Sequence, residues 1–217
     1  MIIADETAAR AYVGKWADQA GLDLLEYLAA RLIEENTRQN LVAAATLPLL
    51  WQRHFADSAQ LLQFVSRETP GESVGPWLDL GSGAGFPGLV LAILRPGDPV
   101  TLVESRRKRI EWLGRMVDEL ALANCVVEGR RLELVESAPV GLITARAFAP
   151  LRSLLELSAR FSTERTVYLL PKGRSAAQEL AEMPKWIRQT FHVEQSLTDA
   201  DAGILVGRLN KEARARL

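Results

Sequence analysis

The sequence predicts an α/β protein with a doubly wound, mostly parallel β-sheet, an antiparallel end to that sheet, and an N-terminal helical extension. Three observations predict this class. From residue 76 onward, short apolar runs with strand character alternate with longer amphipathic stretches. A glycine-rich turn follows the first of those runs. The first 70 residues instead repeat their apolar side chains at helical spacing.

The N-terminal extension, residues 1–70, is expected to be helical. Thr7 is a candidate cap for a short first helix, which Gly21 interrupts. A third helix includes Pro48 in its first turn, where proline is tolerated, and continues to Phe64. Between them lies a second helix, whose apolar residues recur at helical spacing: Leu24, Leu25, Leu28, Leu32 and Ile33.

Residues 71–217 are expected to form the sheet domain, after a linker at residues 68–76 with two Gly and two Pro. Short apolar strands separated by helices predict a parallel sheet covered on both faces. The strands are expected at residues 77–80, 100–104, 125–128, 141–144 and 166–170, and the helices at residues 87–94, 107–120, 151–161 and 175–187. Two last strands, 191–197 and 204–209, are expected to pair antiparallel across a tight turn.

Composition limits the class of protein. The chain is 48% apolar and 24% charged, as in ordinary globular proteins. It contains no apolar run near the roughly 18 residues of a membrane span. Asp5 and Glu6 stand where a secretory signal would be basic, and the single Cys125 excludes an internal disulfide. We therefore expect a cytoplasmic protein without a membrane anchor or a metal. Residues 141–217 hold 12 basic and 8 acidic side chains, which allows a basic face.

The glycine loop is the strongest local signal. It reads Asp79-Leu80-Gly81-Ser82-Gly83-Ala84-Gly85-Phe86-Pro87-Gly88 and joins a predicted strand to a predicted helix. Glycine allows a sharp turn and the close approach of a ligand because it has no Cβ. The next strand ends in Glu104, 21 residues after Gly83, where a carboxylate can accept hydrogen bonds from ribose hydroxyls. Together these features predict a cofactor that contains adenosine.

Two cofactors fit the spacing of the glycines. Gly83, Gly85 and Gly88 satisfy the pattern of dinucleotide sites. Gly81, Gly83 and Gly85, with Asp79 two residues ahead, satisfy the tighter pattern seen with S-adenosylmethionine. Charge favours the second cofactor, because Asp79 would oppose a pyrophosphate but suits a cationic sulfonium and ammonium. A tight turn that binds nothing is the remaining alternative.

The turn after the fourth predicted strand argues against two kinds of methyl transfer. Residues 144–150 lack the Asn/Asp-Pro-Pro-aromatic motif of enzymes that methylate exocyclic amines. Cytosine C5 methylation needs a thiolate, whereas Cys125 is expected to pack as a small apolar group. A ring nitrogen with a free lone pair, such as guanine N7 or adenine N1, needs neither that motif nor a thiolate. Alignment and electrostatics suffice to catalyse methyl transfer to it.

Arg146 and Lys172 follow the fourth and fifth predicted strands. Ligands bind at this carboxyl edge of such a sheet, so both are candidate catalytic residues. An arginine on guanine N7 would block the attacking atom, so we expect these cations to bind O6 or a phosphate. A simple ion pair of Arg146 with a nearby acid is the alternative.

The chain resembles the bacterial small-subunit rRNA guanine-N7 methyltransferases, the glucose-inhibited division protein B family, over nearly its whole length. The motifs that carry the resemblance are Asn40-Leu41, Arg53-His54-Phe55-Ala56-Asp57-Ser58, the loop from Asp79 to Gly88, Glu104-Ser105, Lys108-Arg109, Arg146-Ala147-Phe148-Ala149 and Lys172-Gly173. The resemblance implies a Rossmann-like class I S-adenosylmethionine methyltransferase. Its implied substrate is a guanine in the decoding-region loop of 16S rRNA, free or in the small ribosomal subunit.

The resemblance also implies cofactor contacts at Gly81, Phe86, Arg131, Leu132 and Arg146. An acid usually stands where Arg131 and Leu132 are, so a contact there is expected through the backbone. The glycines, Asp79 and Glu104 complete the expected cofactor site.

Arg53, His54 and Asp57 share one predicted helix. Arg53 and Asp57 are four residues apart, so a surface ion pair between them is the simplest interpretation. The resemblance instead places this helix at the mouth of the cofactor site, with Arg53 and His54 as substrate contacts. His54 and Asp57 are there expected to orient the loop or the substrate.

Four consecutive cations, Arg106 to Arg109, open a predicted helix, where the helix dipole disfavours positive charge. Contacts of Arg107, Lys108 and Arg109 with RNA phosphates explain this placement, and a solvated surface is the alternative. We expect a monomeric enzyme. A small-molecule methyltransferase on the same fold and a non-enzymatic dinucleotide-binding module are the two other hypotheses.

Overall fold

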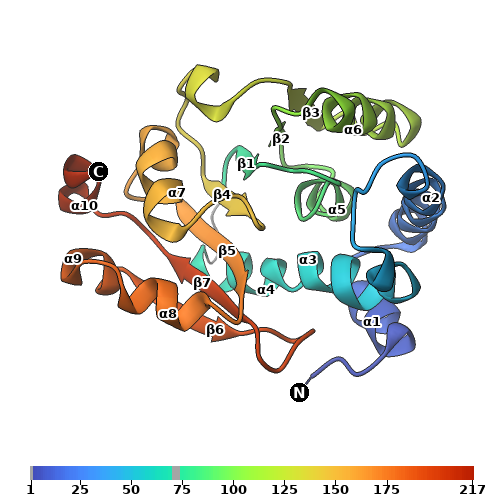
Figure 1. The fold of residues 1–217 in the computed structure, drawn as a ribbon, viewed down its shortest axis with the longest axis horizontal. Coiled ribbons are helices and arrows are strands. Elements are labelled where there is room, and N and C mark those ends of the chain that lie inside the picture. The colour runs from blue at the N-terminus through green and yellow to red at the C-terminus, as the bar shows by residue number, and fades with distance from the viewer. Residues whose placement is uncertain (1, 70–73) are drawn as a thin grey trace.

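A computed structural model describes residues 2–69 and 74–217 (Figure 1). Its centre is a seven-stranded sheet in the order β3-β2-β1-β4-β5-β7-β6. The strands are β1 (Trp77–Leu80), β2 (Val100–Val103), β3 (Cys125–Glu128), β4 (Leu142–Ala145), β5 (Val167–Gly173), β6 (Phe191–Gln195) and β7 (Gly203–Gly207). The first five pair in parallel, and β7 is antiparallel to both β5 and β6. The predicted α/β sheet with an antiparallel end is confirmed.

Helices precede the sheet and cover it. The N-terminal helices are α1 (Glu6–Val13), α2 (Gln19–Asn36), η1 (Ala44–Leu49), η2 (Trp51–Ala56), α3 (Asp57–Ala59) and α4 (Leu61–Glu68). The later ones are α5 (Gly88–Leu94), α6 (Arg107–Glu119), η3 (Leu132–Leu134), α7 (Leu151–Ser158), η4 (Ala159–Phe161), α8 (Ala176–Ala181), α9 (Lys185–Arg188) and α10 (Lys211–Arg216). In the described part of the chain, no helix is long and apolar enough to cross a membrane.

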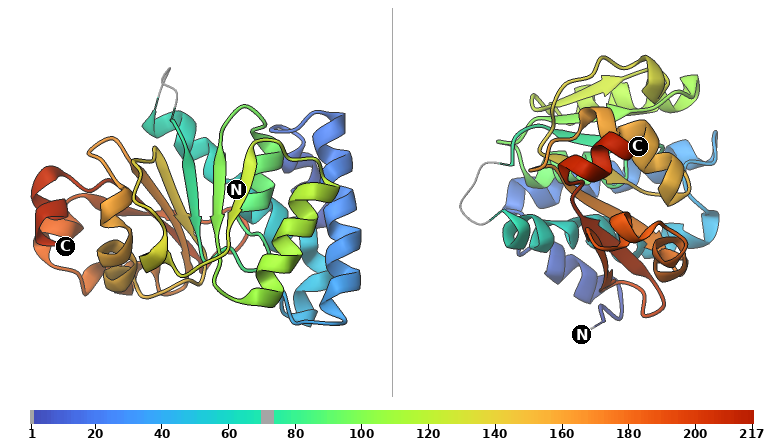
Figure 2. Two further views of the ribbon diagram at one scale, coloured as in Figure 1. Left: turned by 90° about the horizontal axis from the view of Figure 1, so that it is seen from above. Right: turned by 90° about the vertical axis from the view of Figure 1, so that its left-hand side faces the viewer.

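Each face of the sheet has its own apolar core. Helices α1 to α6 pack on one face and α7 to α10 on the other, as the blue-green and orange-red helices of Figure 2 show. Within β1, Trp77 belongs to the first core, whereas Leu78 and Leu80 belong to the second. Successive side chains of a strand point to opposite faces, so a strand buried on both faces is apolar throughout.

The N-terminal extension shares the first core with the sheet. Leu28 and Phe55 from the extension belong to the same buried cluster as Leu89 and Trp112 from the sheet domain. The Glu6 carboxylate accepts hydrogen bonds from the backbone N–H groups of Trp51 and Gln52, which joins α1 to η2. The domain boundary predicted between residues 70 and 71 lies outside the described residues.

The helical predictions need several corrections. Asp5, and not Thr7, caps α1, which ends at Val13. Gly21 does not interrupt a helix but lies in the first turn of α2, where its N–H donates to the capping carboxylate of Asp18. The third helix, predicted as continuous, is a series of a 3₁₀-helix, a π-helix and two short α-helices.

The C-terminal half differs in two places. The helix predicted at residues 175–187 is divided into α8 and α9, because Pro184 lacks the N–H that a continuous helix needs. Helix α10 was not predicted, although Asn210 caps it through a hydrogen bond from the Ala213 N–H.

Gly88 lets α5 approach the sheet. A Cβ at Gly88 would lie 2.2 Å from Leu102 Cδ2 and 2.7 Å from Asp79 Oδ2. A Cβ at Gly114, inside α6, would meet no atom within 4 Å. We expect Gly88→Ala to lower the free energy of unfolding by about 1–3 kcal/mol through overpacking. Gly114→Ala should raise it by about 0.5–1 kcal/mol. Urea unfolding measures both changes, and equal stability of the two variants would contradict the tight contact.

Candidate functional site

The loop between β1 and α5 requires glycine for two physical reasons. Gly81, Gly83 and Gly85 all have positive φ, at 65°, 59° and 102°. A Cβ at Gly81 would lie 2.5 Å from the ring of Phe148, and one at Gly85 would lie 2.3 Å from Leu89. The left-handed backbone turns the chain sharply, and the missing Cβ atoms leave its surface open to close neighbours.

A cavity of about 200 Å³ lies at the carboxyl ends of β1 and β2. Its walls come from the glycine loop, from the end of β2 with the start of α6, from residues near η3, and from the turn after β4. The lining residues are Gly81, Val103, Glu104, Ser105, Arg106, Arg109, Arg130, Leu132, Ala147 and Phe148.

Glu104 joins the two loops that enclose this small cavity. One carboxylate oxygen accepts the N–H groups of Ser105 and Arg106 at 2.7 and 2.8 Å, and the other accepts the N–H of Gly83 at 3.0 Å. A carboxylate has about four acceptor positions, so the oxygen beside Gly83 can take one further donor. Only 5% of the Glu104 surface is exposed, so few groups can reach that acceptor position.

The structure brings only some of the predicted cofactor residues to the small cavity. Gly81, Glu104 and Leu132 line it. Arg131 is exposed and outside the lining, whereas its neighbour Arg130 lies within it. Gly83, Gly85, Phe86 and Asp79 are not among its lining residues, and Arg146 lines the larger cavity described below.

Asp79, predicted to contact the cofactor, is buried and hydrogen-bonded within the protein. It is 1% exposed, and its two oxygens accept hydrogen bonds from Thr144 Oγ1 at 2.8 Å and from the Gly88 N–H at 3.3 Å. Burial raises the pKa of the carboxyl above its usual value, although these hydrogen bonds oppose the shift. The carboxylate therefore connects β1 to β4 and to α5.

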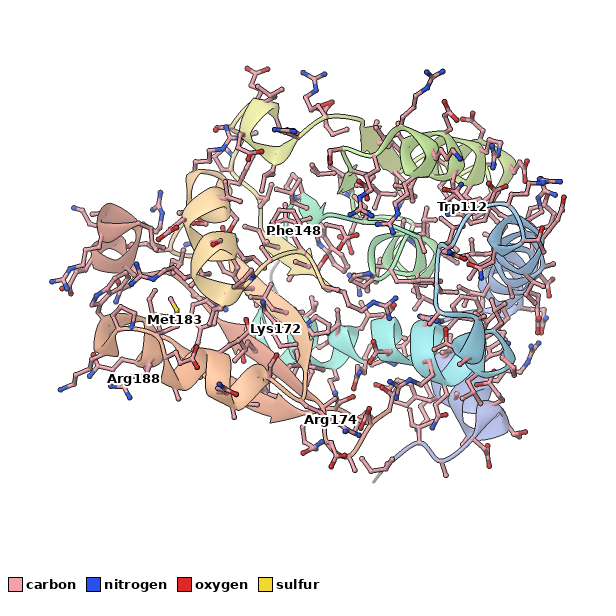
Figure 3. All side chains as sticks on the ribbon, in the orientation of Figure 1. Trp112, Phe148, Lys172, Arg174, Met183 and Arg188 are labelled. Carbon is pink, nitrogen blue, oxygen red and sulfur yellow. The ribbon has the colours of Figure 1, made fainter. Side chains whose placement is uncertain are left out.

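A larger cavity of about 690 Å³ adjoins the small one, since both are lined by Ala147 and Phe148. Its walls combine the N-terminal extension, the turn after β4, the end of β5 and the turn before β7. Four of the predicted catalytic and substrate residues line it: Arg53, His54, Arg146 and Lys172. Figure 3 labels Phe148 and Lys172, which lie near the ends of β4 and β5.

Arg146 is held from several sides. Its guanidinium donates to His54 Nδ1 at 3.0 Å, to the Arg53 carbonyl at 3.2 Å and to Asp57 Oδ2 at 3.3 Å. It also lies over the ring of Phe86, with 5.2 Å between the guanidinium carbon and the ring centroid. Arg146 therefore forms the ion pair with an acid that was the predicted alternative, and it also lines the larger cavity.

The contacts of His54 determine its tautomer. Arginine is only a donor, so His54 Nδ1 accepts and the proton must reside on Nε2. That proton points to Thr46 Oγ1 at 2.9 Å, and the Thr46 hydroxyl donates to the Ala43 carbonyl. Burial, together with the charges of Arg146 and Arg53, lowers the pKa of His54 to about 3. A neutral imidazole therefore positions the guanidinium.

Arg53 and Asp57 do not pair with each other as the simplest interpretation required. Arg53 binds Asp199 in the turn before β7 at 3.0 Å, and Asp57 binds Arg146. Asp57 also accepts a hydrogen bond from Thr198. The two side chains thus join the extension to two different loops around the larger cavity.

Lys172 is 8% exposed and has two partners. Its ammonium donates to the Ala149 carbonyl at 2.7 Å and to Glu179 Oε2 at 2.9 Å, which leaves one N–H. Burial alone would raise the pKa of Glu179, but hydrogen bonds from Ser175 and Lys172 and the lysine charge lower it. The pair is therefore ionised, and the lysine is held at the end of β5.

The cations that open α6 separate into two groups. Arg106 and Arg109 line the small cavity, with Arg109 4.0 Å from Glu104. Arg107 is 91% exposed and pairs with Glu111, and Lys108 is also exposed. Of the three predicted RNA contacts here, Arg109 faces the site and the other two face solvent.

Sequence reasoning missed four other residues of the larger cavity. Thr46, Glu179, Asp199 and Phe148 all line the larger cavity. Only Phe148 had a signal, as part of the Arg-Ala-Phe-Ala motif. Thr46 lies in η1, Glu179 in α8 and Asp199 in the turn before β7, and nothing in their spacing predicts their place in the cavity.

The structure also shows the surroundings of the Cys125 thiol and the arrangement of potential metal ligands. Cys125 is buried, and burial with the nearby Asp79 raises the pKa of its thiol to about 12, so it is not a thiolate nucleophile. Within residues 2–69 and 74–217, no group of three His, Cys, Asp or Glu side chains is arranged to hold a metal ion.

The depressed pKa of His54 predicts a dependence of stability on pH. Between pH 6.5 and about 3, the unfolded chain binds a proton at His54 that the folded chain does not, so acid favours unfolding. His54→Asn keeps an acceptor for Arg146 but cannot titrate. We expect its free energy of unfolding to fall less than that of the wild type across this window. His192→Asn, at an exposed histidine, is the matched control. Imidazole NMR showing protonation of His54 near pH 6.5 would contradict the neutral assignment.

The chain is similar in sequence to a family of methyltransferases. A family model described as rRNA small subunit methyltransferase G matches residues 22–203. A ribosomal RNA small subunit methyltransferase G of Erythrobacter litoralis is 60% identical over 95% of this chain and 98% of its own length. One from Novosphingobium aromaticivorans is 54% identical over 96% of this chain and 90% of its own.

Solved structures support the fold. A methyltransferase from Geobacter sulfurreducens has a TM-score of 0.61 at 15% identity and covers 97% of this chain and 99% of its own. A mutant of MtNAS in complex with S-adenosylmethionine has a TM-score of 0.57 at 14% identity and covers 94% of this chain and 77% of its own. The family model spans most of the chain, and the relatives match almost all of it. The chain therefore belongs to the rRNA small subunit methyltransferase G family that its motifs predicted.

Proposed function

We propose that this chain transfers the methyl group of S-adenosylmethionine to N7 of a guanine in the decoding-region loop of 16S rRNA. The observation that carries the proposal is the pair of adjoining cavities at the carboxyl edge of the sheet. The small one is bounded by a glycine turn and a carboxylate, and the larger one is bounded by arginine and lysine. Membership of the family supports the reaction class and the substrate.

The small cavity fits the cofactor. Gly81 presents a backbone surface that any Cβ would cover, and Leu132 offers an apolar wall for a base. Glu104 keeps one acceptor position for a ribose hydroxyl. We assign the cofactor to these three residues, and we give Asp79, Gly83, Gly85 and Phe86 the role of holding the loop in place. When bound, S-adenosylmethionine supplies a methyl group on a cationic sulfur, which a lone pair can displace directly.

The larger cavity suits a guanine with its phosphates. Guanine N7 already has a free lone pair, so no general base is needed. This agrees with His54, whose only unprotonated nitrogen is occupied by Arg146. Arg146 and the remaining N–H of Lys172 are placed to bind O6 or a phosphate, which leaves N7 open. Both residues therefore act by position and charge.

Two exposed cations, Arg107 and Lys108, lie beside the small cavity. Arg107 and Lys108 stand at the start of α6, next to the small cavity that Arg106 and Arg109 line. We propose that they bind backbone phosphates of the RNA, in which case affinity falls steeply as salt is raised. Residues of one chain line both cavities, which supports action as a monomer. The proposed substrate, ribosomal RNA, supports a place in the cytoplasm.

The function is tested with labelled S-adenosylmethionine and small subunits whose 16S rRNA lacks the modification, followed by mapping of the methylated atom. We expect 7-methylguanosine at one position. Arg146→Ala should lower kcat/KM about 100-fold, as for the loss of one charged donor in an active site. Arg152→Ala, at an exposed arginine on α7 that lines neither cavity, is the control. A methyl group on an exocyclic amine would contradict the proposal.

The assignment of Glu104 makes a separate prediction. Glu104→Gln removes the charge that three backbone N–H groups and the ribose share, so S-adenosylmethionine should bind about tenfold more weakly or worse. Glu128→Gln, at the end of the neighbouring strand β3, changes the same chemistry outside the cavity and should bind normally. Isothermal titration calorimetry measures both constants. Equal affinities would remove Glu104 from the cofactor site.

A further inference from the structure

Phe148 is the feature that joins the two cavities. It lines both of them, in the turn between β4 and α7. Within the described residues, no other phenylalanine, tyrosine or tryptophan lines either cavity. Its ring lies against Gly81, close enough that a Cβ there would be 2.5 Å from Cδ2. A single flat apolar side chain therefore stands between the proposed cofactor site and the proposed guanine site.

The backbone holds this ring in place. Ala147, the preceding residue, has φ +53°, a conformation that costs energy for a residue with a Cβ. Phe148 is half-buried against the second apolar core and otherwise exposed to the cavities. The strained turn thus presents the ring at the cavity wall instead of burying it fully.

The other two rings near the site, those of Phe86 and His54, are almost entirely covered. Phe86 is 3% exposed, with the His54 ring stacked on it at 4.8 Å and the Arg146 guanidinium over it. His54 is itself buried and bonded through both nitrogens. A base that enters the larger cavity therefore meets one aromatic face, that of Phe148.

We propose that Phe148 stacks on the target guanine and sets the plane of the base for methyl transfer; this inference rests on the proposed function. The attacking lone pair of N7 lies in the plane of the purine ring. A platform against the face of the base leaves that edge free and fixes the direction of the lone pair. The cations Arg146 and Lys172 hold the edge or the phosphate, but they do not control the tilt of the ring. Stacking on aromatic side chains provides such control for unstacked bases.

The test compares Phe148→Leu with Phe148→Tyr and Phe148→Trp under single-turnover conditions at saturating S-adenosylmethionine. Leucine keeps apolar packing but has no aromatic face. The measured quantity is the ratio of the rate constant to the RNA concentration that gives half of the maximal rate. We expect Phe148→Leu to lower this ratio about 10- to 100-fold, the range for loss of one base–aromatic stack. At least one of the two aromatic variants should stay within about threefold of the wild type. The cofactor dissociation constant of Phe148→Leu should also stay within about threefold.

Phe161→Leu is the matched control, because Phe161 is a buried ring in η4 that lines neither cavity. It should lower the melting temperature but not the rate at 25 °C. Wild-type activity in Phe148→Leu, or a loss confined to cofactor affinity, would overturn the stacking role alone. Failure of the wild-type protein to methylate the rRNA would overturn the proposed function, and the stacking role with it.

Discussion

The buried carboxylate of Asp79 is the interaction on which both cavities depend. A charge-bearing group at 1% exposure must be hydrogen-bonded, and Asp79 meets this requirement by binding Thr144 and the N–H of Gly88. The first bond sets β4 beside β1 immediately before the turn that carries Arg146 and Phe148. The second fixes the start of α5 and therefore the end of the glycine loop. One side chain thus positions the walls of both cavities.

The N-terminal extension completes a site that the sheet alone does not form. Its π-helix η2 supplies His54 and the carbonyl of Arg53, and α3 supplies Asp57, all bonded to Arg146. Gln60 connects the same segment to the loop after β6 through the N–H of Leu197. The extension shares a core with the sheet, and this packing holds these groups against the turn that carries Arg146.

The cations that line the larger cavity are paired with carboxylates. Arg146, Arg53 and Lys172 each have a carboxylate partner, which lets cations remain charged in a partly buried place. His54 stays neutral among them because burial disfavours a charged imidazole and because Arg146 and Arg53 would repel it, which together lower its pKa to about 3. Free N–H groups then remain for an anionic ligand, while the basic atoms of the site, His54 Nδ1 and the carboxylates of Asp57, Glu179 and Asp199, are bonded to the cations. This arrangement suits transfer to an atom that already has its lone pair.

The fold class, the glycine turn, the acid after β2 and the family were predictable from residue order, because these features depend on local patterns: apolar periodicity, left-handed backbone positions and ordered motifs. Three other features depend on how the chain packs: Asp79 is buried, Arg130 and not Arg131 lines the small cavity, and Arg53 and Asp57 bind separate partners. The same packing places Phe148 between the cavities. Such outcomes depend on which long-range partner satisfies a buried charge or covers an aromatic ring, and residue spacing along the chain does not contain that information.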